Sequence, residues 1–236
     1  INKILYDNKE YWRLTKNLST RDFINDLLKY TQLEKYKLVF PSYKYLRYTW
    51  GKVSYFKLVS SINTKAYLSH YSAMYLHDLT EQIPKSIFVN VEQSNRGKNK
   101  KGELAQDRID RVFSREQRIT NNVTSIGEYK VFLINGKFTN NLGVVDFTYN
   151  DELLQTTDIE RTLIDITVRP VYSGGTFEVL KAFKSAAGKF SVNKLTSYLS
   201  KIDYTYPYHQ SIGFYLEKSG EYNKSQINLL KKFEIK

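Results

Sequence analysis

Cysteine is absent from the sequence and histidine is scarce. Without thiols the chain can form no disulfide, thiolate metal site or cysteine nucleophile, as is usual in the reducing cytoplasm, where we expect this protein to act. Among the 3 histidines, His70 and His77 are seven residues apart, unlike the four-residue spacing of a helical zinc pair. No Gly-rich phosphate loop is present either. We therefore expect no metal and no cofactor.

Long apolar runs are missing as well. None approaches the ~18 residues that a membrane span requires, so we expect no membrane partner. Hydrophobic residues make up 41% of the chain and charged residues 25%, a balance typical of globular proteins that excludes wholesale disorder. The chain opens at Ile1 without a targeting segment. Because a start methionine is lacking, we expect a few residues to precede Ile1.

Positive charge is what the sequence has in excess. Its 36 Lys and Arg against 24 Asp and Glu give a formal net charge of +12. Residues 1–60 hold 12 basic and 5 acidic residues, so this first quarter carries more than half of the excess. Such an imbalance is expected of a small module that meets a polyanion. A general solubility charge in a chain rich in Lys and Tyr is the alternative explanation.

A capped helix is predicted over Leu18–Tyr30. Ser19 is a suitable N-cap, and Asp22 follows it three residues later. Four apolar residues then recur at helical spacing on one side, while the polar residues Asn25 and Lys29 lie on the other. The helix therefore has an apolar face for packing and a polar face for solvent or a ligand.

Aromatic-rich segments of period two follow this helix. They predict strands over residues 37–40, 43–48 and 53–59, with turns at Pro41 and Gly51. A helix followed by a basic β-ribbon is the order of a winged helix-turn-helix. The candidate base readers are Thr20, Arg21 and Asn25, and the candidate phosphate contacts are Lys29, Lys35, Lys37, Lys44, Arg47 and Lys52. A solvated helix beside an exposed hairpin is the alternative, and Asp22 and Asp26 count against dense phosphate contact.

The rest of the chain predicts a larger mixed domain. We expect a helix from Thr64 to His77, a strand over residues 86–91, a basic loop at residues 96–101, and a hairpin that joins residues 130–134 to 142–147 through Asn135-Gly136. From Gln155 onward the chain is predicted to be helical, with a capping box at Thr157 and Glu160 and helices over 191–202 and 209–219. Residues 231–236 are predicted as an interrupted strand, so we expect the C-terminus to be incomplete. The predicted fold class is α+β, with a winged helix-turn-helix over residues 1–62 and a mixed α/β domain with a helical C-terminal half over 63–236.

A metal-dependent nuclease is an alternative because the protein is basic. Glu128 and Lys130 match the Glu-x-Lys half of a restriction-type site, with Asp110 as the possible first ligand. However, Asp110 lies in a segment that is predicted as helix or loop, and a Glu-x-Lys triplet is common in a Lys-rich chain. We therefore predict that the protein is not an enzyme.

Several segments, taken in order, resemble AbiEi-type antitoxins. Residues 66–79 (AYLSHYSAMYLHDL) are similar to the helix that follows the winged module in that family. Residues 157–165 (TDIERTLID), together with Arg169-Pro170 and Gly174-Gly175, resemble another family segment, and residues 206–217 (YPYHQSIGFYLE) a third. The resemblance extends from about residue 15 to 230. Two departures are visible: Asp78 stands where Gly is common, and the helices before the recognition helix are short or missing.

This resemblance implies an antitoxin and transcriptional autorepressor of a type IV toxin–antitoxin operon that acts in abortive infection. The partners would be inverted repeats in promoter DNA and a nucleotidyltransferase-like toxin, which is usually countered without a stable complex. Arg161, Asp165 and Arg169 are the candidate residues for the antitoxin function, although spacing alone predicts a surface or interhelix ion pair for the first two. A nuclease, or a winged-helix regulator of another phage-defence operon, are the alternatives.

Overall fold

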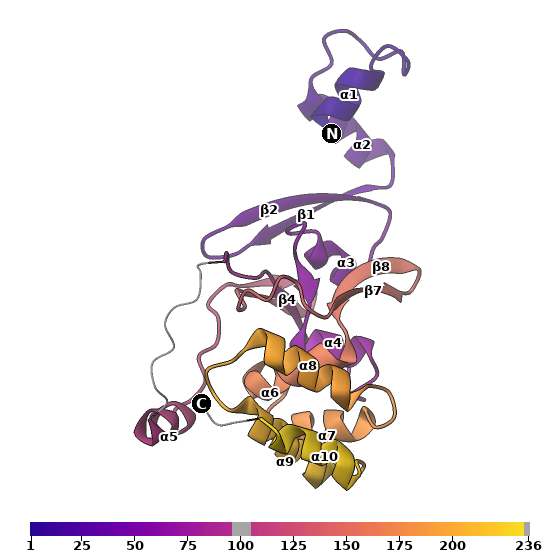
Figure 1. Ribbon diagram of the computed structural model, residues 1–236. Helices are drawn as coiled ribbons and strands as arrows, with labels where there is room; N and C mark the ends of the chain where they lie inside the picture. Colours follow the sequence, from indigo (N-terminus) through magenta and orange to yellow (C-terminus); the bar gives the residue numbers. More distant parts are fainter. Residues whose placement is uncertain (96–104, 234–236) are drawn as a thin grey trace.

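The computed structural model describes residues 1–95 and 105–233 and has a mixed α+β fold (Figure 1). Its central element is a six-stranded mixed sheet in the spatial order β5-β6-β4-β3-β8-β7. The parallel pairs are β3 with β8 and β4 with β6; the other neighbours are antiparallel. The strands are β3 (Tyr67–Leu68), β4 (Ser86–Asn90), β5 (Val123–Ile126), β6 (Tyr129–Ile134), β7 (Val144–Tyr149) and β8 (Glu152–Thr157).

The C-terminal half is helical, as predicted, and packs around its own apolar core. Its elements are α6 (Ile159–Val168), η1 (Pro170–Tyr172), α7 (Thr176–Ser185), α8 (Val192–Ile202), α9 (Tyr208–Ser219) and α10 (Lys224–Lys231). Two predicted boundaries are confirmed. The Ser191 hydroxyl accepts a hydrogen bond from the backbone N–H of Lys194 at the start of α8, and Gly220 ends α9 with a φ of 74°.

Three predictions in this half are wrong. The chain is not helical from Gln155, because residues up to Thr157 form β8. The side-chain cap of α6 is Asp158, whose carboxylate accepts from the backbone N–H of Arg161, and not Thr157. No strand begins at residue 231, because Lys231 is the last residue of α10, which starts with an Asn223–Gln226 capping box. Residues 234–236 of the predicted strand lie outside the described part.

The predicted hairpin at Asn135-Gly136 is also wrong. The strands expected to pair, β6 and β7, are separated in the sheet by β4, β3 and β8. Instead, the backbone N–H of Gly136 donates to the side-chain oxygen of Asn90 at 2.9 Å, and the backbone N–H of Gln93 donates to the Gly136 carbonyl at 2.9 Å. A Cβ at position 136 would lie 2.6 Å from the Asn90 side chain. The absence of a side chain at position 136 therefore lets the backbone after β6 approach the end of β4 closely. After this contact the chain crosses the sheet to reach β7.

The N-terminal part contains α1 (Asn2–Asn8), α2 (Thr20–Tyr30), the antiparallel ribbon of β1 (Leu33–Val39) and β2 (Lys44–Trp50), and α3 (Tyr55–Ser60). The predicted capped helix is confirmed, since the Ser19 hydroxyl accepts from the backbone N–H of Asp22 at 3.1 Å. The predicted strand over 53–59 is wrong, because most of this segment forms α3. Ser54 caps the helix, and the apolar residues of α3 pack on the sheet. Figure 1 shows α1 and α2 at the outer end of the molecule, beyond the ribbon.

The predicted helix over 64–77 is shorter than expected. Tyr67 and Leu68 form β3 between β4 and β8, and α4 (His70–Leu76) begins only at His70. His70 has a φ of 51°, in the left-handed region that a continuous helix cannot contain. Asp78, which ends this segment, also lies in the left-handed region, with a φ of 53°, a conformation that glycine adopts without steric cost.

The ribbon and the sheet share one apolar core. Leu38 and Phe40 of the ribbon segment and Phe56 of α3 pack in a cluster with buried residues of the sheet, among them Ile87 and Val131. The proposed domain boundary after residue 62 stays a prediction, and α3 contributes side chains to the core on the far side of that boundary. Among the described residues, no helix has the length and apolar character needed to span a membrane. The remaining helix, α5 (Gln106–Phe113), has no buried residue.

Candidate nucleic-acid interface and a cationic pocket

Three ribbon lysines share one face, here called the lysine face: Lys35, Lys37 and Lys44. Lys35 and Lys37 are two residues apart on β1, and Lys44 lies directly opposite Val39, the next residue on that side of the strand. Alternate residues of a strand and directly paired residues of two strands lie on the same face. All three lysines are exposed. The ribbon thus presents a row of positive charge to solvent.

Arg47 does not belong to the lysine face. It pairs with Tyr36 on the other side of the ribbon, where Leu38 is buried. Its Nε donates to the Ser61 carbonyl at 2.9 Å and its Nη2 to the Ile62 carbonyl at 2.7 Å. The guanidinium therefore holds the ribbon against the end of α3. Lys52, in the loop after β2, is exposed.

Helix α2 presents its polar side to solvent. Arg21, Asn25 and Lys29 are exposed, and no residue of the helix is buried. The Thr20 hydroxyl donates to the side-chain oxygen of Asn2 at 2.7 Å, which links this predicted base reader to α1. The structure thus brings together an exposed polar helix and an exposed cationic ribbon that follow one another in the chain. The predicted basic loop at 96–101 lies outside the described residues.

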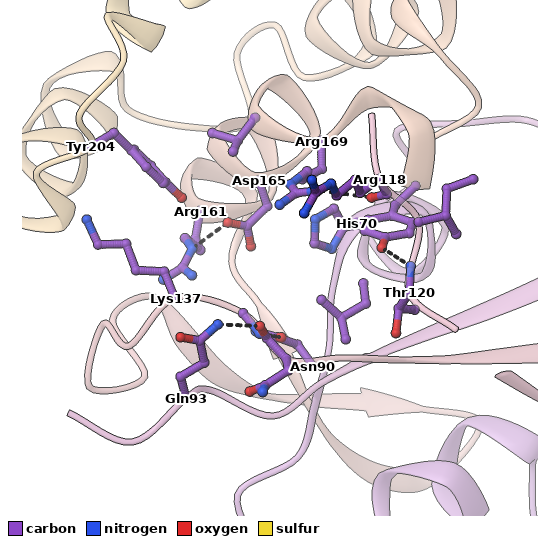
Figure 2. Close-up of a pocket in the computed structure, with 16 residues that line it drawn as sticks. His70, Asn90, Gln93, Arg118, Thr120, Lys137, Arg161, Asp165, Arg169 and Tyr204 are labelled. Atoms are coloured by element: carbon purple, nitrogen blue, oxygen red, sulfur yellow. Dashed lines mark hydrogen bonds and ion pairs between the residues drawn. The ribbon is translucent and has the colours of Figure 1, made fainter. Parts of the chain in front are cut away.

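The three candidate antitoxin residues line a single pocket of about 440 Å³. Its walls come from the start of α4, the end of β4, the segment before β5, the segment after β6, one side of α6, η1 and the loop after α8 (Figure 2). Arg161, Asp165 and Arg169 face it together with Arg118 and Lys137. Four cationic side chains and one carboxylate therefore meet in one cavity.

Arg161 and Asp165 form a buried ion pair. The Arg161 Nε lies 2.8 Å from the Asp165 Oδ1, and the two side chains are only 3% and 7% exposed. The expectation of a surface or interhelix pair is therefore wrong: the pair lies within α6 and is buried. Desolvation alone would lower the pKa of Arg161, but the Asp165 charge more than offsets it and the pKa is raised. Arg161 is thus a fixed cation.

Arg161 and Asp165 differ in how completely they are bonded. The Arg161 Nη1 donates to the Thr139 hydroxyl at 2.9 Å and to the Leu142 carbonyl at 2.8 Å. By contrast, Asp165 Oδ2 is buried and has no hydrogen-bond partner among the residues that the structure describes. A buried acceptor of this kind costs about 1–3 kcal/mol, and more for a charged group. The pocket therefore contains an unused acceptor.

His70 contributes a neutral ring to this pocket. Burial lowers its pKa to about 4, although the nearby Asp165 charge opposes that shift. Its Nδ1 lies 2.9 Å from the Ser69 hydroxyl, and its ring meets the edge of Tyr172 with centroids 5.4 Å apart. The histidine is consequently uncharged at neutral pH, so it does not compensate the Asp165 carboxylate.

Only part of this site could be predicted from the sequence. Arg161, Asp165 and Arg169 follow from the family resemblance and from their positions along one segment. Arg118 and Lys137 are not indicated, because each stands in an irregular segment with no motif. The pocket depends on the crossing of segments that are far apart in the chain, which no local pattern indicates.

The residues of the nuclease alternative are not assembled into a described metal site. Glu128 lies in the turn between β5 and β6, whereas Asp110 lies on α5. Within residues 1–95 and 105–233, no three His, Asp or Glu residues are grouped closely enough to hold a metal. His77, which follows α4, has its Nε2 2.6 Å from the Thr157 carbonyl and so joins α4 to the end of β8.

Comparison with known proteins supports the fold. No protein-family model matches the chain, and no curated protein matches it. Among solved structures, it is similar to the crystal structure of the RV2827C protein from Mycobacterium tuberculosis, with a TM-score of 0.59 and 15% sequence identity. The match covers 99% of this chain and 75% of that one. At this identity the likeness shows the fold alone, and it extends over nearly the whole chain.

Proposed function

We propose that this protein is a DNA-binding autorepressor and antitoxin of a type IV toxin–antitoxin operon. The observation that carries the DNA-binding half is that α2, which exposes Arg21, Asn25 and Lys29, is followed directly in the chain by the ribbon with its exposed lysine face. In this proposal α2 is the recognition helix and the β1–β2 ribbon is the wing of a winged helix-turn-helix. The lysines hold phosphates, and the polar helix residues read base edges.

The antitoxin half is supported by the resemblance of three segments to AbiEi-type antitoxins. One of them contains Arg161, Asp165 and Arg169, and these residues meet at one pocket. The partner in this proposal is a nucleotidyltransferase-like toxin that is encoded beside the antitoxin. Protection would come from the part of the chain after residue 62, without a requirement for a stable complex. No observation on the described residues favours the nuclease alternative.

Binding to labelled promoter duplex, followed by fluorescence anisotropy at several salt concentrations, tests the DNA-binding half. The triple variant Lys35→Ala, Lys37→Ala, Lys44→Ala should weaken binding to all sequences alike. It should also flatten the slope of log affinity against log salt by ~0.9 for each phosphate that is no longer neutralised. The matched control is Lys184→Ala, Lys201→Ala, Lys224→Ala, which removes the same charge from exposed positions on α7, α8 and α10.

Two outcomes would contradict this half of the proposal. One is the absence of binding to the promoter duplex at low salt; the other is equal weakening by the test and control triples. Sequence reading is tested separately with Arg21→Ala and Asn25→Ala. Each should reduce the preference for the operator over unrelated DNA by about 1–3 kcal/mol if its side chain contacts a base.

Growth of cells that co-express the neighbouring toxin tests the antitoxin half. The full-length lysine triple variant should still protect these cells when it is expressed from a foreign promoter, because its substitutions lie outside the region assigned to protection. If a folded triple variant fails to protect, the assignment of DNA binding to the N-terminal part and of protection to the chain after residue 62 is wrong. A full chain is used because Phe56 and Leu38 belong to the core that is shared with the sheet.

A further inference from the structure

The pocket has a polarity that the proposed function does not explain. Arg118 and Arg169 are exposed at its edge, while Arg161 and Asp165 are buried along α6. Arg169 Nη1 donates to the Arg118 carbonyl at 3.1 Å, so the segment before β5 and the end of α6 are held together there. Among the described residues, no hydrogen bond or ion pair engages the Arg118 guanidinium. Cationic donors thus lie at the opening and an unused acceptor lies deeper.

Each end of the pocket selects a different chemical group. Guanidinium groups present planar, charged donors that match the oxygens of phosphate. Asp165 Oδ2 requires an O–H or N–H donor, since an anion placed against it would be repelled and an apolar group would leave it unbonded. The neutral His70 adds no positive charge beside this oxygen. A ligand that satisfies both ends must carry a phosphate and, on its other side, a hydroxyl or amine.

We propose that this pocket binds a small phosphorylated molecule, a sugar phosphate or a nucleotide, with its phosphate at Arg118 and Arg169 and a hydroxyl or amino group on Asp165 Oδ2. The cavity of about 440 Å³ lies within the ~300–1,000 Å³ range of small-molecule sites. Figure 2 shows Asp165 between Arg161 and His70, with Arg118 and Arg169 on the same side of the cavity. The inference goes beyond the proposed function and does not depend on DNA binding.

The shape of the pocket is fixed by hydrogen bonds that do not involve a ligand. The Asn90 side chain bonds the Tyr67 hydroxyl and the Gly136 backbone, and the Tyr67 hydroxyl donates to Glu92 at 3.1 Å. Glu92 accepts in turn from the backbone N–H of Thr139 at 2.8 Å. Because these groups are already bonded to one another, the pocket is preorganised, and binding does not require them to be ordered first.

Isothermal titration calorimetry on the full-length protein tests the proposal with four probes: inorganic phosphate, ribose 5-phosphate, AMP and adenosine. Ribose 5-phosphate or AMP should bind more tightly than inorganic phosphate, because only they place a donor at Asp165. Adenosine, which lacks the phosphate, should bind at least tenfold more weakly than AMP. If AMP binds more tightly than ribose 5-phosphate, the ligand class is a nucleotide; if ribose 5-phosphate binds more tightly, it is a sugar phosphate.

Variants separate the two ends of the pocket. Arg118→Gln and Arg169→Gln should each weaken binding of the phosphorylated probes about tenfold to a hundredfold, the value of a charged hydrogen bond. Arg115→Gln is the matched control, since Arg115 is exposed nearby in the chain and does not line the pocket. Asp165→Asn should remove the preference for ribose 5-phosphate over inorganic phosphate.

The proposal is overturned if no phosphorylated probe binds at millimolar concentration, or if Arg115→Gln weakens binding as much as the two pocket variants do. It is also overturned if inorganic phosphate binds as tightly as ribose 5-phosphate to the unchanged protein. Should Asp165→Asn fail to fold, which circular dichroism would show, the arginine variants still decide whether the phosphate site exists. Because these assays contain no DNA and no toxin, failure of the repressor or antitoxin proposal would leave their result unaffected.

Discussion

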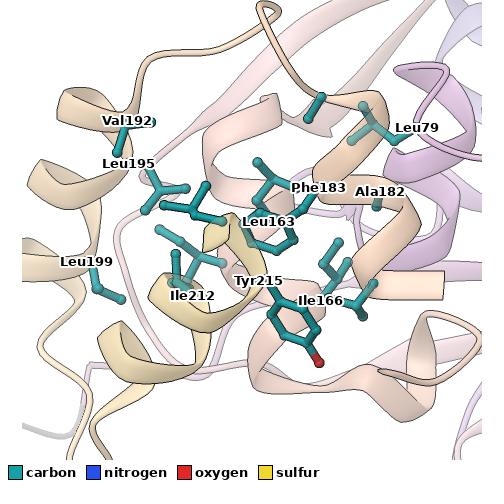
Figure 3. Packing of buried hydrophobic residues seen from close by; sticks show 14 of the residues in the cluster. Leu79, Leu163, Ile166, Ala182, Phe183, Val192, Leu195, Leu199, Ile212 and Tyr215 are labelled. Atoms are coloured by element: carbon teal, nitrogen blue, oxygen red, sulfur yellow. The ribbon is translucent and has the colours of Figure 1, made fainter. Parts of the chain in front are cut away.

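Helices α2 and α6 have similar lengths and opposite environments. No residue of α2 is buried, whereas eight of the ten residues of α6 are, including Arg161 and Asp165. Figure 3 shows Leu163 and Ile166 of α6 pointing into the core among side chains of α7, α8 and α9. A helix that is buried on all sides must bond its polar residues internally, while an exposed helix leaves them for water or a partner. Identical residue types, such as Arg21 and Arg161, therefore have different roles in the two helices.

Replacement of the buried arginine should have the largest effect on stability. Arg161→Ala leaves the Asp165 carboxylate buried and unpaired, so we expect the free energy of unfolding to fall by about 3–5 kcal/mol. Arg21→Ala on α2 should change it by less than about 0.5 kcal/mol. Urea denaturation followed by circular dichroism measures both. The double variant Arg161→Leu, Asp165→Leu should recover much of the stability; equal destabilisation by the single and double variants would contradict this account.

Acid should destabilise the protein through the buried His70 and the partly buried His77. The folded-state pKa of His70 is lowered to about 4, and burial lowers the pKa of His77 as well. The unfolded chain takes up protons at about pH 6.5 and the folded state does not. The contribution of these histidines to the free energy of unfolding is therefore fully present above that pH and is lost as the pH falls toward 4. The slope should reach about 1.4 kcal/mol per pH unit for His70.

A substitution at the same position checks this pH dependence. His70→Asn removes the titrating ring and keeps a residue that tolerates the φ of 51° found there. Urea denaturation between pH 4 and 7 should therefore show a shallower dependence in the variant. His209→Asn is the control at a more accessible site and should change the slope less. An unchanged slope in His70→Asn would show that His70 is not the group responsible.

Removal of the α2 cap should have the smallest effect and stay local. Ser19→Ala removes the acceptor for the backbone N–H of Asp22, at a cost of about 1 kcal/mol to the helix. Amide hydrogen exchange in α2 should accelerate, while exchange in α6 should not change, because α2 adds no buried residue to the core. Equal acceleration in both helices would show that the two regions unfold together.

Local chemistry made much of the secondary structure predictable. The caps at Ser19 and Ser191 and the glycine that ends α9 act within one turn of a helix, so their residues are adjacent in the sequence. Apolar periodicity likewise places α8 and α9, although the start of the helical half was predicted too early. The failures have a different origin. The segment over 53–59 fits a strand by its alternating pattern, but it became α3 because packing on the sheet favoured a capped helix.

The sequence by itself determined the α+β class, the starts of α2, α8 and α9, and the concentration of positive charge in the first 60 residues, because composition and short-range spacing carry this information. Only the tertiary structure decided which charged side chains are exposed to solvent and which are bonded within the protein. It aligned Lys35, Lys37 and Lys44 on one face through the register of β1 and β2, and it engaged Arg47 on the other. It also buried the Arg161–Asp165 pair beside a pocket whose walls come from segments far apart in the chain. Burial and strand register depend on long-range contacts, and no local pattern specifies them.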